Sequence, residues 1–189
     1  MSSATKNTST KQIVIVSAVS LFLIALMSTA FVVPSRAADT TVTSTIGSVM
    51  SLFTTSGTVT LNATPTSGGV QTTASDTVTI STNNTAGYTL QLAETTAATA
   101  LTSGSNTIPA TSGTQASPTA LTANQWGYRV DGAGGFGAGP TSALSSAAIG
   151  SVTYAGVPVT ASPNTIKTTA TTATNNTTTV WYSVAVNTA

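Results

Sequence analysis

The sequence predicts an all-β protein in which a single antiparallel β-sandwich follows an N-terminal apolar segment. Three observations support this fold class. Several short segments alternate between apolar and hydroxyl-bearing residues, which is the pattern of a half-buried strand. Gly, Pro and Asn residues that favour turns separate these segments. Beyond the apolar segment, only residues 93–100 are compatible with a helical turn.

The N-terminal segment has the features of an export signal. Two lysines precede an apolar run over residues 13–33, and a proline and small residues follow it. This order predicts a signal peptide over residues 1–37, with cleavage between Ala37 and Ala38. Because the run is longer than an ordinary signal core, an uncleaved membrane anchor through the same run is the alternative. In both cases residues 38–189 are expected outside the cell, as an extracellular or cell-surface domain.

The sandwich is expected to occupy residues 38–189 as one domain. Its clearest alternation lies at Thr58–Asn62, at 76–82 and at 87–93. The last two segments flank Asn83–Gly87, a turn-forming stretch, so we expect them to pair as a hairpin. The other expected strands are 106–110, 125–130, 150–154, 164–168 and 177–186, with a less regular one at Thr41–Phe53.

The glycine-rich run 132–139 is predicted to be a loop that leaves a strand. A phosphate cradle would need a lysine and a following helix, and the run has neither. In the strand before it, Trp126, Tyr128 and Val130 share one face, and Gly127 between them allows a close backbone approach. A tryptophan at the centre of many short strands is typical of immunoglobulin-like, Greek-key sandwiches.

The composition leaves little chemistry for an active site. The chain has no His and no Cys, which excludes Ser-His-Asp triads, thiol nucleophiles and ordinary zinc sites. The sequence therefore predicts a protein that is not an enzyme and has no cofactor or metal. Two alternatives depend on carboxylates: a hydrolase using two of Asp76, Glu94 and Asp131, although their spacing sets no pair together, and a calcium site at Asp131 with loop carbonyls.

The charge balance argues against a nucleic-acid partner. After the leader, the chain carries two cations against four anions. So few cations cannot release many counterions from a polyphosphate. The charged residues of this part are Asp39, Asp76, Glu94, Arg129, Asp131 and Lys167.

Aromatic side chains are the best candidates for ligand contact, because they can stack on the faces of sugars. In the strand 177–186, Trp181 alternates with Val180 and Tyr182, so one of the two aromatics is expected at the surface. We predict that Trp181 is this surface aromatic, and that Tyr154 is a second ligand contact.

Several longer motifs resemble a group of poorly characterised exported surface proteins of the Saccharibacteria and related candidate-phyla bacteria. They are TVTLNATP at 58–65, DTVTISTNNTAGYTL at 76–90, WGYRVDG at 126–132 and FGAGP at 136–140. The resemblance implies an envelope location and an adhesive role, with cell-wall glycan or a host-cell surface as partner.

The group usually continues beyond the strand matching 177–187 with a further turn and a final strand. The resemblance thus implies that the sandwich lacks its final strand. This would reflect either a truncated chain or an open sheet edge through which copies associate.

The leading prediction is therefore a secreted or envelope-displayed β-sandwich for surface structure or attachment. A carbohydrate-binding module is one alternative. Another is a fibre subunit that exchanges strands, with Thr41–Phe53 filling the open edge of a neighbouring copy.

Overall fold

The computed structural model describes residues 47–188. The predicted leader 1–37, its cleavage site between Ala37 and Ala38 and the apolar run 13–33 lie outside the described residues. The part that is described belongs to one compact unit, Ile46–Ala189. Its regular elements are all strands, so the all-β prediction is confirmed. Within it, no helix reaches the length and apolar character that crossing a membrane requires.

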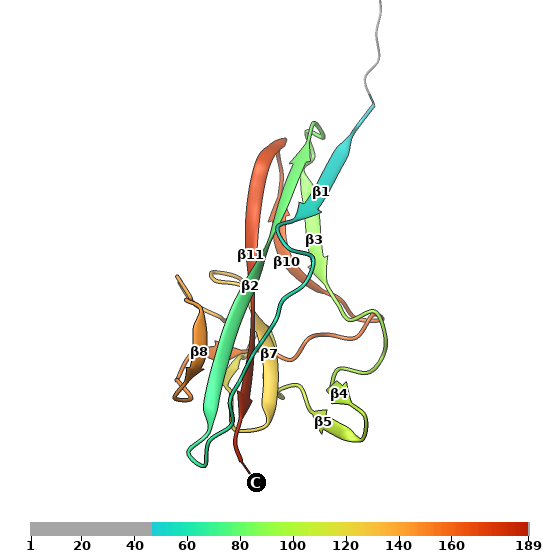
Figure 1. Cartoon of the computed structure of the whole chain (residues 1–189). Coiled ribbons are helices and arrows are strands. Elements are labelled where there is room, and N and C mark those ends of the chain that lie inside the picture. Colours follow the sequence, from blue (N-terminus) through green and yellow to red (C-terminus); the bar gives the residue numbers. More distant parts are fainter. Residues whose placement is uncertain (1–46, 189) are drawn as a thin grey trace, which may run out of the picture. The chain divides into compact units, whose positions relative to one another are not determined.

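Two long strands at the centre of the fold carry the main sheet (Figure 1). β2 and β11 pair antiparallel along most of their length. β1 and β8 pair with different halves of β2, and β7 pairs with the C-terminal half of β11. The bounds are β1 Met50–Thr54, β2 Val70–Thr82, β7 Gln125–Arg129, β8 Leu144–Ala147 and β11 Ala173–Val186.

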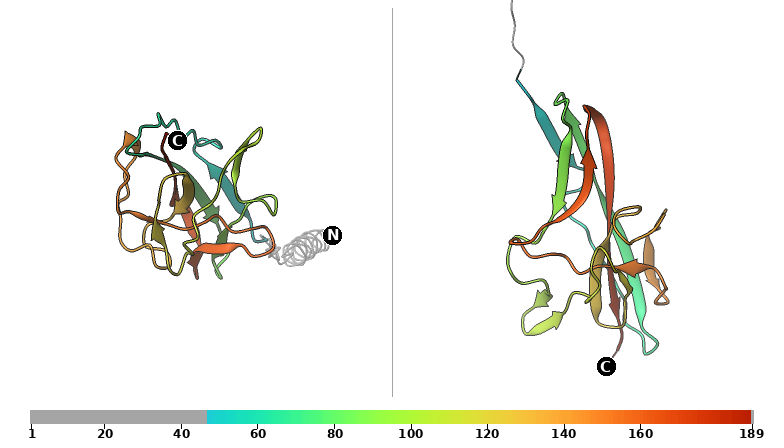
Figure 2. Two further views of the ribbon diagram at one scale, coloured as in Figure 1. Left: turned by 90° about the horizontal axis from the view of Figure 1, so that it is seen from below. Right: turned by 180° about the vertical axis from the view of Figure 1, so that it is seen from behind.

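Three two-stranded antiparallel sheets surround the main sheet (Figure 2). β3 pairs with β10, β4 with β5, and β6 with β9. The bounds are β3 Tyr88–Leu92, β4 Leu101–Ser103, β5 Asn106–Ile108, β6 Thr119–Ala120, β9 Thr153–Tyr154 and β10 Asn164–Thr169. Of the expected strand 150–154, only the last two residues are a strand.

The predicted hairpin between 76–82 and 87–93 is wrong. Both segments are strands, but β2 pairs with β1, β8 and β11, whereas β3 pairs with β10. The turn between them carries the chain from one sheet to the other. Ile80 before the turn and Tyr88 after it lie in one buried cluster with Ala173, which joins the two sheets. The alternation predicts that both segments are strands, but it carries no information about which strand is the partner.

The predicted strand Thr58–Asn62 is also wrong as a paired strand. Residues 58–63 alternate between exposed and half-buried positions, and Leu61 and Ala63 pack against the main core. No backbone-to-backbone hydrogen bond links these six residues to the rest of 47–188. The segment therefore has the side-chain pattern of a strand but no partner. Of the weaker prediction Thr41–Phe53, β1 covers the last four residues.

The largest core cluster confirms the predicted aromatic face of β7. Trp126, Tyr128 and Val130 are all buried, and they pack with Val180 and Val184 of β11. The close approach predicted at Gly127 is present as well. A Cβ atom at that position would lie 2.6 Å from the carbonyl oxygen of Ala155, so only glycine fits there without a shift of the backbone.

The lower half of the main sheet in Figure 1, where residues 70–73 of β2 pair with 183–186 of β11, is buried on both faces. The sequence did not predict this burial. On the face opposite the aromatic core, the hydroxyls of Thr73 and Ser183 share a hydrogen bond of 2.8 Å. Gln71 donates from Nε2 to Ser183 Oγ at 2.9 Å and accepts at Oε1 from the backbone N–H of Gly150. Hydroxyl and amide groups expected at the surface are thus satisfied inside the protein.

Candidate binding cleft

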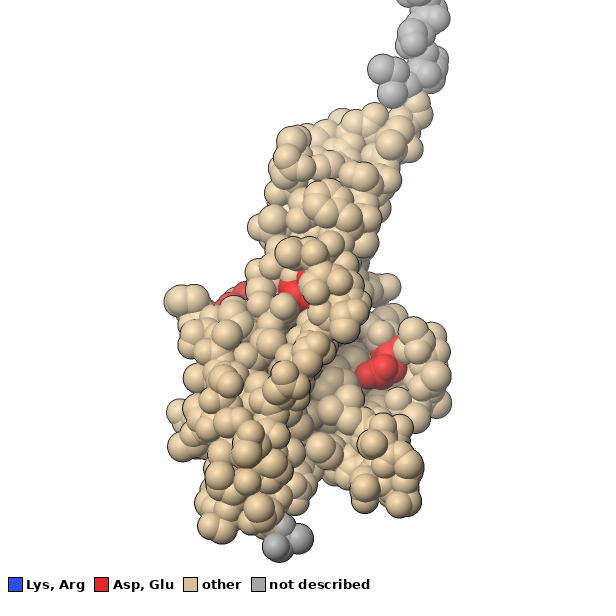
Figure 3. Space-filling view, in the orientation of Figure 1, with Lys and Arg blue, Asp and Glu red and all other residues tan. Residues whose placement is uncertain are grey.

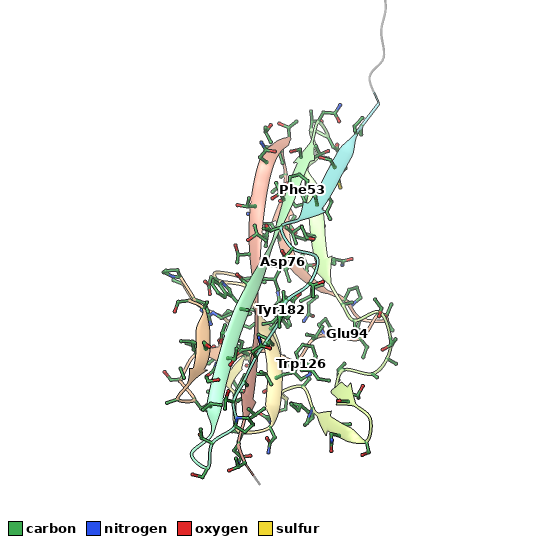
Figure 4. All side chains as sticks on the ribbon, in the orientation of Figure 1. Phe53, Asp76, Glu94, Trp126 and Tyr182 are labelled. Carbon is green, nitrogen blue, oxygen red and sulfur yellow. The ribbon has the colours of Figure 1, made fainter. Side chains whose placement is uncertain are left out.

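A cleft on one face of the molecule brings aromatic and acidic side chains together (Figure 4). Its volume is about 290 Å³, near the lower limit for cavities that hold small ligands. We call it the Tyr182 cleft. Its lining residues are Gly57, Thr58, Val59, Leu61, Asp76, Leu101, Trp126 and Tyr182.

The floor of the cleft is formed by neighbouring strands of the main sheet. Tyr182 lies on β11 and is half-buried. Trp126 lies on β7, paired with Val184, two residues further along β11. The Trp126 Nε1–H donates to the carbonyl of Thr99 at 2.9 Å, which holds the indole ring in a fixed orientation. The indole ring is therefore held in place beside Tyr182, which lies on the adjacent strand.

One wall of the cleft is the unpaired segment that includes Thr58, Val59 and Leu61. Its backbone N–H groups have no backbone acceptor within the described residues, so they can bond to water or to a ligand. Leu101 of β4, one of the exposed large hydrophobic residues, also lines the cleft. The cleft thus combines an aromatic floor with a polar backbone wall.

Asp76 lines the cleft from β2. Its Oδ1 accepts from the backbone N–H groups of Ser56 at 3.0 Å and Thr77 at 2.9 Å. In residues 47–188 no group donates to its Oδ2. The carboxylate is therefore oriented by the backbone on one side and free to accept hydrogen bonds on the other.

Glu94 lies in the same region of the molecule (Figure 4). Its backbone is fixed to the 158–160 loop, because Glu94 N–H donates to Pro158 at 2.8 Å and Thr160 Oγ1 donates to the Glu94 carbonyl at 2.5 Å. Burial raises the pKa of Tyr182, and the negative charges of Asp76 and Glu94 raise it further. Both carboxylates are thus within electrostatic reach of one phenol.

Figure 3 shows acidic side chains on this face and no lysine or arginine. Of the two cations in the part that the structure describes, Arg129 is buried in an ion pair, and Lys167 donates to the Thr177 carbonyl at 3.3 Å. The face is therefore acidic and has no basic group with which to hold an anion.

The sequence did not predict this site. Asp76 lies within β2 and Glu94 two residues beyond β3, so spacing alone could not place both near Tyr182. Asp131 lies elsewhere, in the glycine-rich loop. The available signal was the alternation in the strand 177–186, which requires one of its two neighbouring aromatics to face outward.

Trp181 lies in a different hollow. It is half-buried and lines a groove of about 780 Å³, together with Lys167, the threonines 177–179 and part of the glycine-rich loop. Trp181 and Tyr182 are consecutive on β11 and therefore point to opposite faces. Each of the two aromatics thus belongs to its own hollow.

The prediction that Tyr154 contacts a ligand is wrong. Its side chain is fully buried, with 0 % exposure, and its hydroxyl shares a hydrogen bond of 3.3 Å with Thr73. The reason is the additional layer on the lower half of the main sheet. β9 carries Tyr154 into that layer, so a residue expected at the surface lies between layers.

The glycine-rich run is a loop with turns at 131–136, and a buried arginine organises it. The Arg129 side chain is 6 % exposed, and its Nε donates to Asp131 Oδ1 at 2.6 Å. Its Nη2 donates to the carbonyls of Gly137 and Ala138, at 3.5 Å each. The carboxylate and the loop carbonyls of the alternative calcium site therefore face a guanidinium.

Asp131 also accepts two hydrogen bonds from Thr141, at 2.7 Å each from its N–H and its hydroxyl. Burial by itself would raise the pKa of Asp131, but the bonds from Thr141 and the bond and charge of Arg129 together lower it. Throughout residues 47–188, no three His, Cys, Asp or Glu side chains form a group that could hold a metal ion.

Comparison of the chain with protein-family models, with curated proteins and with solved structures finds no significant match.

Proposed function

We propose that this protein is a non-enzymatic module displayed outside the cell, where it serves envelope structure or attachment, and that the Tyr182 cleft binds a carbohydrate. The observation that carries the proposal is the meeting of two aromatic side chains, an oriented carboxylate and an unpaired backbone segment in one cleft.

The chemistry of the cleft fits a neutral sugar. A sugar ring offers an apolar face that stacks on an aromatic side chain and hydroxyl groups that donate to a carboxylate. The free Oδ2 of Asp76 and the backbone groups of residues 58–61 supply acceptors and donors for those hydroxyls. An anionic ligand would be repelled by Asp76 and Glu94, which no nearby cation of the described part of the chain balances.

A role in attachment also fits the few reactive groups of the chain. Without His or Cys, catalysis would depend on Asp76 and Glu94 acting as a pair. Asp76 has a structural task, because its Oδ1 joins Ser56 to β2. We therefore assign the two carboxylates to hydrogen bonding and to the exclusion of anions. Hydrolysis of a bound oligosaccharide by the purified protein would overturn this assignment.

The fold is proposed to be a variant of the immunoglobulin-like sandwich. Support comes from the buried Trp126 at the centre of the core and from the chain crossing between sheets after β2. In this variant, the segment 58–63 occupies a strand position without pairing.

The cleft is tested by variants of neighbouring residues. Asp76→Asn is expected to weaken glycan binding by at least tenfold, because a hydrogen bond to a charged group is worth about 1.5–3 kcal/mol. Tyr182→Ala is also expected to weaken binding by at least tenfold, because it removes the ring on which the sugar stacks. Trp181→Ala is the matched control on the opposite face of β11 and should leave binding unchanged. Binding is measured on a glycan array and by calorimetry, with circular dichroism to verify folding.

If Trp181→Ala weakened binding and the two cleft variants did not, the binding site would lie in the groove that Trp181 lines. Asp76→Asn keeps the acceptor for the N–H groups of Ser56 and Thr77, so it is informative even if Tyr182→Ala unfolds. A folded Asp76→Asn variant with undiminished binding would contradict the proposed cleft.

Export is tested separately. Mass spectrometry of the protein recovered from outside the cells should give Ala38 as its first residue if the leader is cleaved, and the intact N-terminus if it remains as an anchor. Labelling of intact cells should decorate their surface in both cases. A signal confined to the cytosol would contradict the surface role.

A further inference from the structure

The exposed apolar side chains of the described residues are concentrated at one strand. Six large hydrophobic residues are exposed, and four of them lie in or directly before β1, at 53–64 % exposure. One of the four, Phe53, is labelled in Figure 4. The four are Val49, Met50, Leu52 and Phe53. In a domain whose other surfaces are rich in threonine, such a concentration marks an interaction site.

Among the residues that the structure describes, nothing pairs with the outer edge of β1. Within residues 47–188, β1 is the terminal strand of its sheet. Two hydrogen bonds show which residues of β1 face β2. Asn83 N–H donates to the Val49 carbonyl, and Thr55 N–H donates to the Thr77 carbonyl, so the odd-numbered residues of β1 bond to β2. In an antiparallel pair, the backbone N–H and C=O groups of the residues between them point away from the partner strand. The N–H and C=O groups of Met50, Leu52 and Thr54 therefore face away from β2.

Nothing in β1 protects this edge. Natural edge strands are blunted by charges, prolines, bulges or a covering element. Residues 47–64 contain no proline and 47–75 no charged residue, and the pairing of β1 with β2 has no register shift. Two copies of this strand could approach without electrostatic repulsion.

We propose that β1 pairs edge to edge with β1 of a second copy of this chain. The pairing is antiparallel about a twofold axis at Leu52. Each residue whose backbone groups face away from β2 then lies opposite another such residue. Leu52 lies opposite the partner's Leu52, and Met50 lies opposite the partner's Thr54. This register makes about six backbone hydrogen bonds. It joins the two main sheets into one and covers apolar side chains on both faces of β1.

The preceding part of the same chain is a poorer occupant for this edge. Asn83 binds Val49 N–H at 2.7 Å and the Gly47 carbonyl at 3.2 Å, so the chain would have to reverse before Gly47. The segment Thr40–Ile46 contains no Gly, Pro, Asn or Asp, the residues that form tight hairpin turns. A second copy meets no such obstacle.

The register is tested with single cysteines, since the chain has none of its own. At the twofold axis the two Cα atoms lie about 5.5 Å apart, within the range of a disulfide. Full-length Leu52→Cys, purified in detergent, is expected to form a covalent dimer on mild oxidation. Met50→Cys, equally exposed, should remain monomeric on a non-reducing gel because its counterpart lies four residues away. Equal crosslinking of both variants, or of neither, would overturn the proposal.

Association without crosslinking is measured by light scattering in the same detergent. The unmodified chain is expected to have twice the monomer mass, and Leu52→Lys to lose dimerisation because it places like charges at the axis. Val152→Lys removes an exposed hydrophobic residue elsewhere and should keep the dimer. A chain that is monomeric throughout, or a dimer that Leu52→Lys leaves intact, would refute the pairing. The carbohydrate cleft is not involved in either test.

Discussion

Asp131→Asn is expected to lower the free energy of unfolding by about 3 kcal/mol, the lower end of the range for removing one partner of a buried ion pair. The Arg129 side chain is 6 % exposed and that of Asp131 22 %, so solvent screens the pair only partly. The substitution keeps an acceptor near Thr141 but leaves the guanidinium buried without its counter-charge. Urea unfolding followed by tryptophan fluorescence gives the difference.

Two controls distinguish the effect of losing the ion pair from the effect of losing any carboxylate. Asp76→Asn removes an acidic group that has no ion-pair partner within residues 47–188, and it should change stability by less than about 1 kcal/mol. The double variant Arg129→Met with Asp131→Asn should recover part of the loss, because no charge remains buried. A loss below about 1 kcal/mol for Asp131→Asn alone would mean that solvent screens the pair.

The same pair predicts how stability depends on acid. The pKa of Asp131 is lower in the fold than in the unfolded chain, where it is about 3.9. Its contribution is therefore complete above about pH 4 and is lost as the pH falls below that value through the folded pKa. The native protein should lose stability in this range, and Asp131→Asn should lose less of it.

Gly87→Ala is expected to destabilise the fold by roughly 2–6 kcal/mol. About 1–3 kcal/mol comes from the positive φ, which is 76° at Gly87. About the same amount comes from overpacking, because a Cβ atom would overlap the carbonyl oxygen of Thr169. This contact lies where the chain crosses from β2 to β3 and β3 begins to pair with β10.

Gly104→Ala isolates the steric part of the effect. Gly104 has a φ of 61°, and a Cβ atom there would meet nothing within 4 Å. The two variants therefore share the backbone strain and differ in the contact with Thr169. Thermal unfolding should show the larger loss for Gly87→Ala. Equal losses would mean that the β3–β10 sheet moves to make room.

The sequence predicted those features that depend on local pattern. The shared face of Trp126, Tyr128 and Val130 and the loop after them follow from alternation and from glycine content, and both are present. Pairing was not predictable in this way. The segment 76–82 alternates equally well whether its neighbour is β3 or β11, and distant residues decide which strand it meets.

Buried hydroxyls account for the second class of errors. Thr73, Ser183 and Gln71 have polar side chains of types that are usually exposed. In the structure they bond to one another beneath β9, and Tyr154 is buried with them. A hydroxyl can be satisfied by water or by another hydroxyl, so the residue type alone does not show on which side of a sheet the protein continues.

The candidate cleft escaped prediction for a related reason. Asp76, Leu101, Trp126 and Tyr182 come from four separate stretches of the sequence, and no spacing rule connects them. What brings them together is the crossing after β2 and the pairing of β7 with β11. Both are properties of topology, which a period-two pattern leaves undetermined.

The buried Arg129 also determines how the glycine-rich loop depends on metal ions. Many exposed loops keep their shape through bound calcium, and they soften when the ion becomes scarce. In this loop the positive charge that gathers the carboxylate and the carbonyls belongs to the chain itself. The shape of the loop therefore does not depend on the calcium concentration around the protein.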